Sequence, residues 1–193
     1  MRIHSFLEDK FYHIANELLN KANLHETTHF TTIPHPDISS ANAFELLNRV
    51  IYSIPHRMFK RYLQNIPYLL FNGIGLNKQN LLSYMTICIA HEVGHAMQED
   101  LVEKATMLRY LKSSEMLKTL NTTEELQDHV KIYRDLLVSL EEDAWERAWT
   151  LLPDEITRKT FDIVRKKSLG TYQKENYLQG EQEFHSTYLL LTC

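Results

Sequence analysis

Apolar side chains recur at helical spacing along most of this chain. Over residues 5–23 they return every three or four positions, which predicts an amphipathic helix. The same spacing predicts a helix over residues 40–54 and a long helical region from Leu81 to about Leu120, which contains few helix breakers. The pattern therefore predicts a mainly α fold.

A signal for a new helix follows this long region. Thr122 and Glu125 stand at the spacing of a capping box, in which each side chain bonds the backbone amide of the other at the start of a helix. This predicts a helix that continues to Leu152, where Pro153 breaks it. A further helix is expected over residues 155–168.

Two stretches depart from the helical pattern. Residues 27–39 are rich in threonine and serine and contain Pro34 and Pro36, so they are predicted to form a loop. Residues 68–76 are a short apolar run closed by glycines, which favours a strand or hairpin. We therefore expect a mainly α (α+β) protein with a small sheet or hairpin.

Length and charge narrow the class of protein. The 193 residues suit one domain (1–193), with a helical N-terminal part (1–65) and a weakly patterned C-terminal tail (171–193). A hydrophobic content of 44% is ordinary for a globular protein with a core. The net charge of -4 provides no basic excess, which argues against a nucleic-acid partner.

Signals for export or membrane insertion are not evident in the sequence. The first residues contain no apolar signal-peptide core, and no apolar run approaches the roughly 20 residues that cross a bilayer. The two cysteines, Cys88 and Cys193, lie far apart in sequence. We therefore expect a cytoplasmic protein with reduced thiols and no membrane partner.

The motif His-Glu-x-x-His occurs twice, at residues 25–29 and 91–95. On a helix this spacing puts two imidazoles one turn apart on one face, with a carboxylate beside them, which is the minimum equipment of a hydrolytic zinc site. One such site needs a single copy. The surroundings of each copy must decide which one is functional.

The first copy lies in unfavourable surroundings. Thr27 and Thr28 separate His25 from His29, and β-branched residues weaken a helix. The copy also falls where the first helix is expected to end. We interpret it as a polar helix end and loop, with adventitious metal binding beside His35 as the alternative.

The second copy lies in favourable surroundings. Apolar residues lead into it, so its helix is predicted to be central and buried, with Cys88 as a small core residue. Gly94 costs a helix about 1 kcal/mol relative to alanine, which indicates that backbone or substrate approaches closely there. Buried imidazoles are costly without partners. We predict that His91 and His95 bind Zn²⁺ as a cofactor.

A catalytic zinc usually takes a third protein ligand. The metzincin pattern places a histidine six residues after the second one, but this chain has Leu101 there. Glu99 and Asp100 are expected to face solvent or to support the ligands. The third ligand must therefore come from another part of the chain.

Glu141 is the favoured third ligand because it heads an inward stripe within an acidic stretch. The stripe has helical spacing and includes small residues that let helices approach closely: Glu141, Ala144, Trp145, Ala148 and Leu152. Glu142 is the nearest alternative, and His129 is a weaker one. We predict that His91, His95 and Glu141 are the metal ligands.

These residues resemble the ImmA/IrrE family of zinc metallopeptidases over roughly residues 66–153. The resemblance rests on two motifs, His91-Glu92-Val93-Gly94-His95 and Glu141-x-x-Ala144-x-x-x-Ala148 followed by Leu151-Leu152-Pro153. It implies a zincin-like core with an active-site helix. It also implies an intracellular bacterial or phage protease that cleaves one regulatory protein, such as a repressor. The long helical interval between the motifs departs from the family pattern.

The predicted reaction is zinc-dependent hydrolysis of a protein or peptide substrate. Glu92 is the expected catalytic base, which accepts a proton from the attacking water and passes it to the leaving amine. Residues 68–76 would supply an edge strand for the substrate. The donor that stabilises the oxyanion is left open among Tyr84, Tyr172 and His185.

A catalytically inactive zincin that binds a protein partner is the alternative function. The intact Glu92 argues against it, because a pure binding module needs no catalytic base. A nucleic-acid regulator is a third reading, against which the acidic charge balance counts. The sequence leaves the oligomeric state open.

Overall fold

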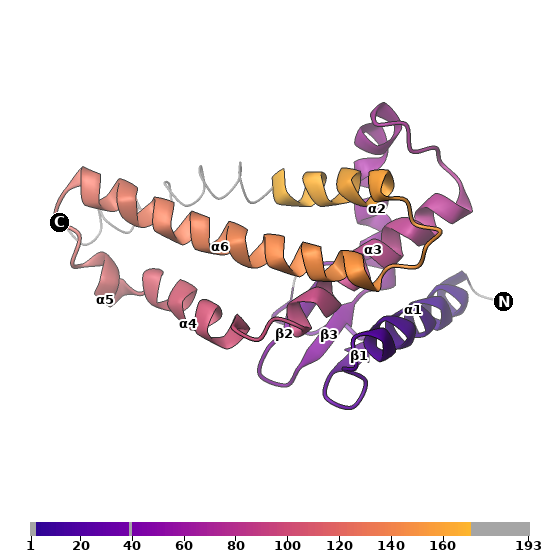
Figure 1. The fold of residues 1–193 in the computed structure, drawn as a ribbon, viewed down its shortest axis with the longest axis horizontal. Helices are drawn as coiled ribbons and strands as arrows, with labels where there is room; N and C mark the ends of the chain where they lie inside the picture. Colours follow the sequence, from indigo (N-terminus) through magenta and orange to yellow (C-terminus); the bar gives the residue numbers. More distant parts are fainter. Residues whose placement is uncertain (1–2, 39, 171–193) are drawn as a thin grey trace. The chain divides into compact units, whose positions relative to one another are not determined.

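In the computed structural model of this chain, residues 3–38 and 40–170 are described, so the predicted tail (171–193) with Tyr172 and His185 lies outside them. The described part is mainly helical with one three-stranded sheet, which confirms the predicted mainly α class. The elements in chain order are α1 (Ile3–Lys21), β1 (His29–Thr31), β2 (Asn42–Glu45), β3 (Val50–Ser53), α2 (Pro55–Phe71), α3 (Lys78–Ala96), α4 (Leu101–Leu111), α5 (Ser114–Leu117) and α6 (Thr123–Leu151) (Figure 1). Residues 158–170 are also helical.

Backbone contacts divide the chain into two compact units. Among the described residues, one comprises 3–98 and Asp143–Arg165, and the other comprises Glu99–Glu142 and 166–170. One boundary falls inside the continuous helix α6, between Glu142 and Asp143. The single zincin-like domain over 1–193 stays a prediction.

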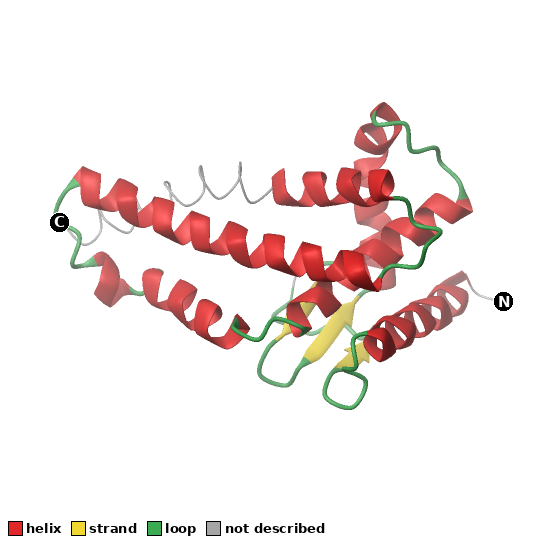
Figure 2. Ribbon diagram, viewed as in Figure 1, coloured by secondary structure: helices red, strands yellow, loops and turns green. Residues whose placement is uncertain are grey.

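The sheet belongs to the first unit and has the strand order β1-β3-β2 (Figure 2). Strand β1 is parallel to β3, whereas β2 is antiparallel to it. Ile51 of the central strand is fully buried and pairs with Phe30 on one side and Phe44 on the other. Strands β2 and β3 contact α3, so the sheet lies against the helix that carries the second motif.

The helix predicted over residues 40–54 is wrong, because this stretch forms the β2–β3 hairpin. The Glu45 carboxylate accepts the backbone amides of Leu47 and Asn48 at 2.9 and 3.0 Å and thereby closes the turn. Arg49 has a φ of 52°, which no α-helix accommodates. Leu47 is 87% exposed at the turn, although the helical pattern placed it among inward residues. The apolar residues of these two short strands and their turn thus happen to have helical spacing in the sequence.

The predicted loop over residues 27–39 is wrong in part, because His29–Thr31 forms strand β1. Its hydrogen-bonding partner is β3, which lies well downstream in the chain. A strand that depends on such a distant partner leaves little local signal. The predicted helical N-terminal part (1–65) is also wrong, since it contains the whole sheet between α1 and α2.

The strand or hairpin predicted over residues 68–76 is wrong as well. Helix α2 contains Pro67 and extends to Phe71. Gly73 has a φ of 81°, and the next amide bonds back to the carbonyl of Leu69 at 2.9 Å, as at many helix ends. Only one side of the run faces the core: Leu69 is 2% exposed and Phe71 is 89% exposed.

The long helical region predicted after Leu81 is divided into α3, α4 and α5. The Ser113 hydroxyl caps α5 by accepting a first-turn amide at 3.2 Å. The predicted capping box is confirmed at the start of α6, because Thr122 and Glu125 each accept the backbone amide of the other at 3.1 Å. Helix α6 ends at Leu151, close to the predicted end.

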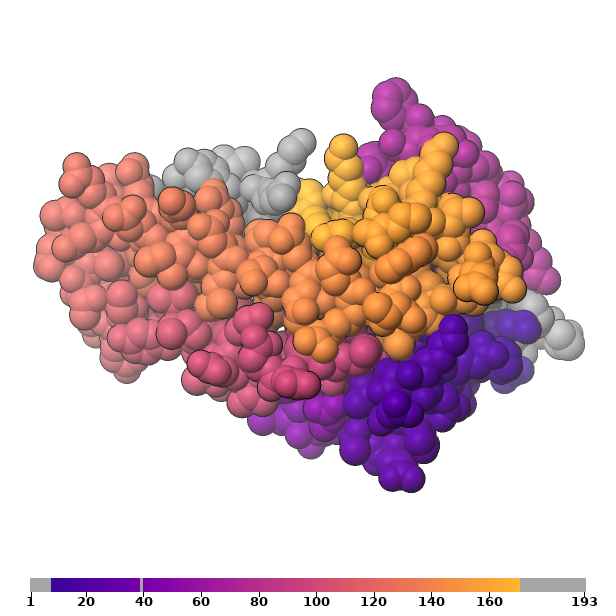
Figure 3. All heavy atoms as spheres, viewed as in Figure 1, coloured from indigo at the N-terminus to yellow at the C-terminus, as the bar shows by residue number. Residues whose placement is uncertain are grey.

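Helix α3 forms the centre of the first unit. It contacts α1, α2, β2 and β3, and nearly every side chain from Ser83 to Ala96 is buried. The Lys21 ammonium at the end of α1 donates to the Leu151 carbonyl at 3.1 Å. The space-filling view accordingly shows the N-terminal residues beside those near residue 150 (Figure 3). The prediction that the helix of the second motif is central and buried is confirmed.

The second unit has a smaller apolar cluster of its own. Its buried members and the residue packed on them are Leu117, Leu126, Val130 and Leu120. None of the described helices is both long and apolar enough to cross a membrane.

Candidate metal centre

Helix α3 brings both histidines of the second motif to one place. His91 and His95 lie one turn apart with ring centroids 4.6 Å apart, and they are 7% and 8% exposed. The Asn77 side chain caps the helix by accepting the Asn80 amide at 2.8 Å. The helix therefore starts from a fixed first turn and carries the motif on its buried part.

Helix α6 adds a carboxylate to these imidazoles. His91, His95 and Glu141 each offer one ligand atom, and these atoms all lie within 4.8 Å of one another. Glu141 is 6% exposed. Two imidazole nitrogens and one carboxylate oxygen are the donor set of many catalytic zinc sites. This buried cluster, hereafter the metal cluster, could hold a metal ion.

The rivals for the third ligand position lie elsewhere. Glu142 is exposed, and so are Glu99 and Asp100. His129 is buried in the second unit, where its Nε2 lies 2.7 Å from the carbonyl oxygen of Leu111. No further group of three metal-binding side chains meets within the described residues.

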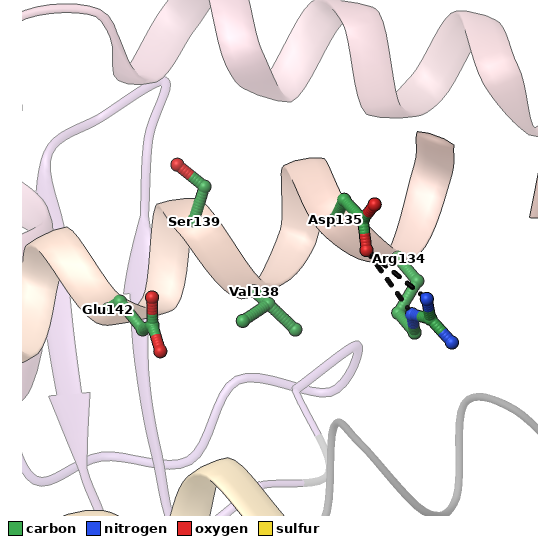
Figure 4. A pocket seen from close by; sticks show the side chains of 5 residues that line it. All are labelled: Arg134, Asp135, Val138, Ser139 and Glu142. Atoms are coloured by element: carbon green, nitrogen blue, oxygen red, sulfur yellow. Dashed lines mark hydrogen bonds and ion pairs between the residues drawn. The ribbon is translucent and has the colours of Figure 1, made fainter. Parts of the chain in front are cut away.

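Glu142 lines a hollow of about 390 Å³ along α6 instead (Figure 4). Its lining residues are Arg134, Asp135, Val138, Ser139 and Glu142. The Arg134 guanidinium forms an ion pair with Asp135 at 3.3 Å on this surface. None of the three residues of the metal cluster is among the lining residues.

The first motif copy does not form a helix. His25 lies in a turn after α1, and His29 begins strand β1, so the two imidazoles share no helical face. Both side chains are exposed, and His25 lies 3.8 Å from Glu26 in an ion-pair geometry. The interpretation of this copy as a polar helix end and loop is confirmed, apart from the strand.

Glu92 and Trp145 flank His91 on two sides. Glu92 is 7% exposed, and its Oε1 lies 3.6 Å from His91 Nδ1. The indole of Trp145 stacks on the His91 ring, with centroids 4.1 Å apart and an interplanar angle of 16°. The stack limits rotation of the imidazole, and Glu92 lies beside the metal cluster.

Gly94 permits α3 to pass close to α6. A Cβ at this position would lie 3.3 Å from the Ala144 Cα and would collide with the Ala144 carbonyl oxygen. Close approach at Gly94, which the sequence predicted, is therefore confirmed. The contact is backbone to backbone, and it brings the histidine helix against the helix of Glu141.

A polar network contacts Nδ1 of His95. Its Nδ1 lies 2.9 Å from Gln98 Oε1, and the Gln98 side-chain amide donates to the Asp143 carboxylate at 3.0 Å. The Arg147 guanidinium donates to the same carboxylate at 3.1 Å and to the carbonyl of Met97 at 3.0 Å. Sequence reasoning missed this network. Gln98 lies three residues after His95, just beyond the end of α3, and that spacing was the available signal.

Cys88 and Tyr84 lie on α3 before the motif and face α2. Burial raises the pKa of the Cys88 thiol to about 11, so Cys88 is a neutral core residue at ordinary pH, as predicted. Burial also raises the pKa of Tyr84, whose hydroxyl accepts the Asn65 side-chain amide at 3.0 Å. The described contacts thus hold Tyr84 in the packing between α2 and α3.

Compared with protein-family models, curated proteins and solved structures, the chain gives no match. The resemblance to the ImmA/IrrE family therefore depends on the residues of the two motifs and stays a prediction. Assignment of the site depends on its own geometry.

Proposed function

We propose that this protein is a zinc-dependent metallopeptidase. The observation that carries the proposal is the buried metal cluster with a further carboxylate, Glu92, next to it. Three protein ligands leave one zinc coordination position for water or substrate, which distinguishes catalytic from structural sites. His91, His95 and Glu141 would hold the ion.

Each group would have a defined part in peptide hydrolysis. Bound zinc would polarise the scissile carbonyl and acidify the attacking water. Glu92 would accept the proton of that water and deliver it to the leaving amine. Glu92 is 7% exposed, so bulk water would have little access to this transfer. The stacked Trp145 would keep the His91 ring in place.

Strand β2 is the candidate binding edge for the substrate. Within the described sheet it is an edge strand, and it contacts α3. An extended peptide could pair with its open edge through backbone hydrogen bonds. In this proposal β2 takes the role that the sequence assigned to residues 68–76.

The family resemblance suggests a substrate class. It implies an intracellular protease that cleaves one regulatory protein, such as a repressor, in a bacterial or phage setting. A cytoplasmic location fits the same proposal. The competing function is an inactive zincin that binds its protein partner without cleaving it.

Metal content and peptide cleavage together test the proposal. The wild type should bind one zinc per chain and cleave members of a mixed peptide library, as read by mass spectrometry. Glu92→Gln should keep the zinc and lose cleavage. His91→Ala, His95→Ala and Glu141→Ala should lose both, while Glu142→Gln should keep both.

Two results would redirect the assignment. Loss of zinc in His25→Ala but not in His91→Ala would move the site to the first motif copy. Zinc in the wild type without cleavage of peptides or of candidate regulatory proteins would favour the inactive binding protein.

A further inference from the structure

In the polar network next to His95, the ion pair of Asp143 and Arg147 determines which groups donate hydrogen bonds and which accept them. The Asp143 carboxylate forms an ion pair with Arg147 at 3.1 Å, so its oxygens act as acceptors. The Gln98 side chain must therefore turn its NH₂ group toward Asp143, at 3.0 Å. The reversed amide would put two acceptor oxygens face to face.

This amide orientation decides which nitrogen of His95 carries a proton. With its NH₂ group turned to Asp143, Gln98 presents Oε1 to His95 Nδ1 at 2.9 Å. A carbonyl oxygen only accepts, so Nδ1 must donate. A neutral imidazole carries one proton, which leaves the lone pair on Nε2.

We propose that Arg147, Asp143 and Gln98 form a relay that holds His95 in the Nδ1–H tautomer and presents Nε2 to the metal. The inference deepens the proposed function, because it rests on the metal cluster as a binding site. Gln98 is the positioning residue, and Asp143 acts through it. Metal-binding histidines commonly need such a partner on the second ring nitrogen.

The relay also explains why an amide stands between His95 and a carboxylate. A carboxylate in direct contact with His95 would add a negative charge next to the two carboxylates already there, Glu141 and Glu92. The Gln98 amide is neutral, so it can accept from His95 Nδ1 without adding that charge. The charge of Asp143 is balanced by Arg147. Gln98 is 6% exposed, whereas the side chains of Arg147 and Asp143 are 33% and 34% exposed, so the amide is buried and the charged pair remains in contact with solvent.

The tautomer can be measured without metal. In full-length protein labelled with ¹⁵N-histidine and freed of zinc by a chelator, long-range ¹H–¹⁵N spectra report which ring nitrogen is protonated. The His95 signals are identified by their loss in His95→Ala. In the wild type, His95 Nδ1 should be protonated and Nε2 should be unprotonated.

Three variants test the relay itself. Gln98→Leu and Asp143→Asn should each give a mixture of His95 tautomers. Gln98→Leu removes Oε1, and Asp143→Asn allows the Gln98 amide to reverse, because an asparagine can also donate. Asp143→Asn combined with Gln98→Glu should restore the single Nδ1–H form, since a carboxylate at position 98 only accepts. Asp135→Asn makes the same change at an exposed site on α6 and should alter nothing.

Zinc affinity gives the second reading. Gln98→Leu and Asp143→Asn should bind zinc about 10- to 100-fold more weakly in competition with a chelator, and the double variant should recover much of that loss. A purely structural role for Gln98 would not predict recovery in the double variant.

The outcomes separate this inference from the proposed function. An Nε2–H tautomer in the wild type, or a tautomer unchanged in both single variants, would overturn the relay even if zinc binds. A tautomer that responds as expected in a protein without zinc affinity would support the relay and contradict the metallopeptidase.

Discussion

At the residue scale, the two histidine rings differ in what contacts them. Trp145 stacks on the His91 ring, whereas the His95 ring contacts the Gln98 side chain through Nδ1. Trp145 is 1% exposed, and it stacks on the His91 ring and meets Phe161 edge to face at 5.6 Å. Its indole nitrogen is buried and makes no hydrogen bond within the described residues. The contribution of Trp145 therefore comes from packing.

Trp145→Ala should lower the free energy of unfolding by about 3 to 5 kcal/mol, because it leaves a large cavity against His91 and Phe161. Trp145→Phe should cost less than half of that, since an aromatic ring remains and no polar contact is lost. Urea denaturation measures both. Trp149→Ala, at a partly exposed position on the same helix, is the control and should cost clearly less than Trp145→Ala.

The buried thiol of Cys88 predicts a pH dependence of stability. Its pKa is raised to about 11 in the folded protein, from an ordinary value of 9.0. Below pH 9 the thiol is neutral in both states, and between pH 9 and 11 only the unfolded chain ionises. Stability from this group is therefore full below pH 9 and is lost as the pH rises.

Relative to Cys88→Ala, the wild type should lose about 1.4 kcal/mol of unfolding free energy between pH 8 and pH 10. Urea denaturation under reducing conditions at the two pH values measures this difference, in which the titration of other groups cancels. An unchanged difference would contradict a raised thiol pKa.

At the element scale, the site depends on how closely α3 and α6 can approach. Gly94 and Ala144 meet backbone to backbone, and Ala144 and Ala148 are fully buried. The distance between the helices is therefore set by the absence of large side chains. Any group added at Gly94 must push apart the helices that carry the histidines and Glu141.

Gly94→Ala should destabilise the protein by about 1 to 3 kcal/mol or more through overpacking, although alanine favours a helix by about 1 kcal/mol. Zinc binding should weaken in the same variant. Gly75→Ala is the matched control, because a Cβ there meets nothing within 4 Å. Thermal denaturation and zinc titration of the two variants test the prediction, and equal behaviour would refute it.

At the scale of the whole molecule, the three ligands come from segments far apart in sequence. Zinc bound to His91, His95 and Glu141 would link α3 to α6 in the folded chain and bind the unfolded chain far less well. A ligand with this preference stabilises the folded state by mass action. Metal removal should therefore be visible in global stability.

Free zinc at 100 times its Kd should add about 2.7 kcal/mol to the free energy of unfolding, and a chelator should remove it. Thermal unfolding with and without the chelator measures the effect. His91→Ala should show no such difference, whereas His25→Ala should behave like the wild type. A zinc-dependent shift that survives in His91→Ala would place the ion elsewhere.

The sequence by itself determined the features that arise within single helices. The spacing of His91 and His95 fixes them on one face, and the capping box of Thr122 and Glu125 marks the start of α6. The helical spacing around Glu141 also predicted that its side chain faces inward, and Glu141 is buried. Each depends on hydrogen bonds and periodicity over a few residues, so the local sequence contains the information.

Only the tertiary structure decided the features that depend on distant partners. Strand β1 forms by pairing with β3. Residues 40–54 form a hairpin because their strands pack against α3. The choice of Glu141 over Glu142 follows from which side of α6 faces the core. Gln98, just after α3, donates to Asp143 on α6, a contact between residues far apart in sequence. Pairing and burial are properties of the packed chain, so periodicity along the sequence could not supply them.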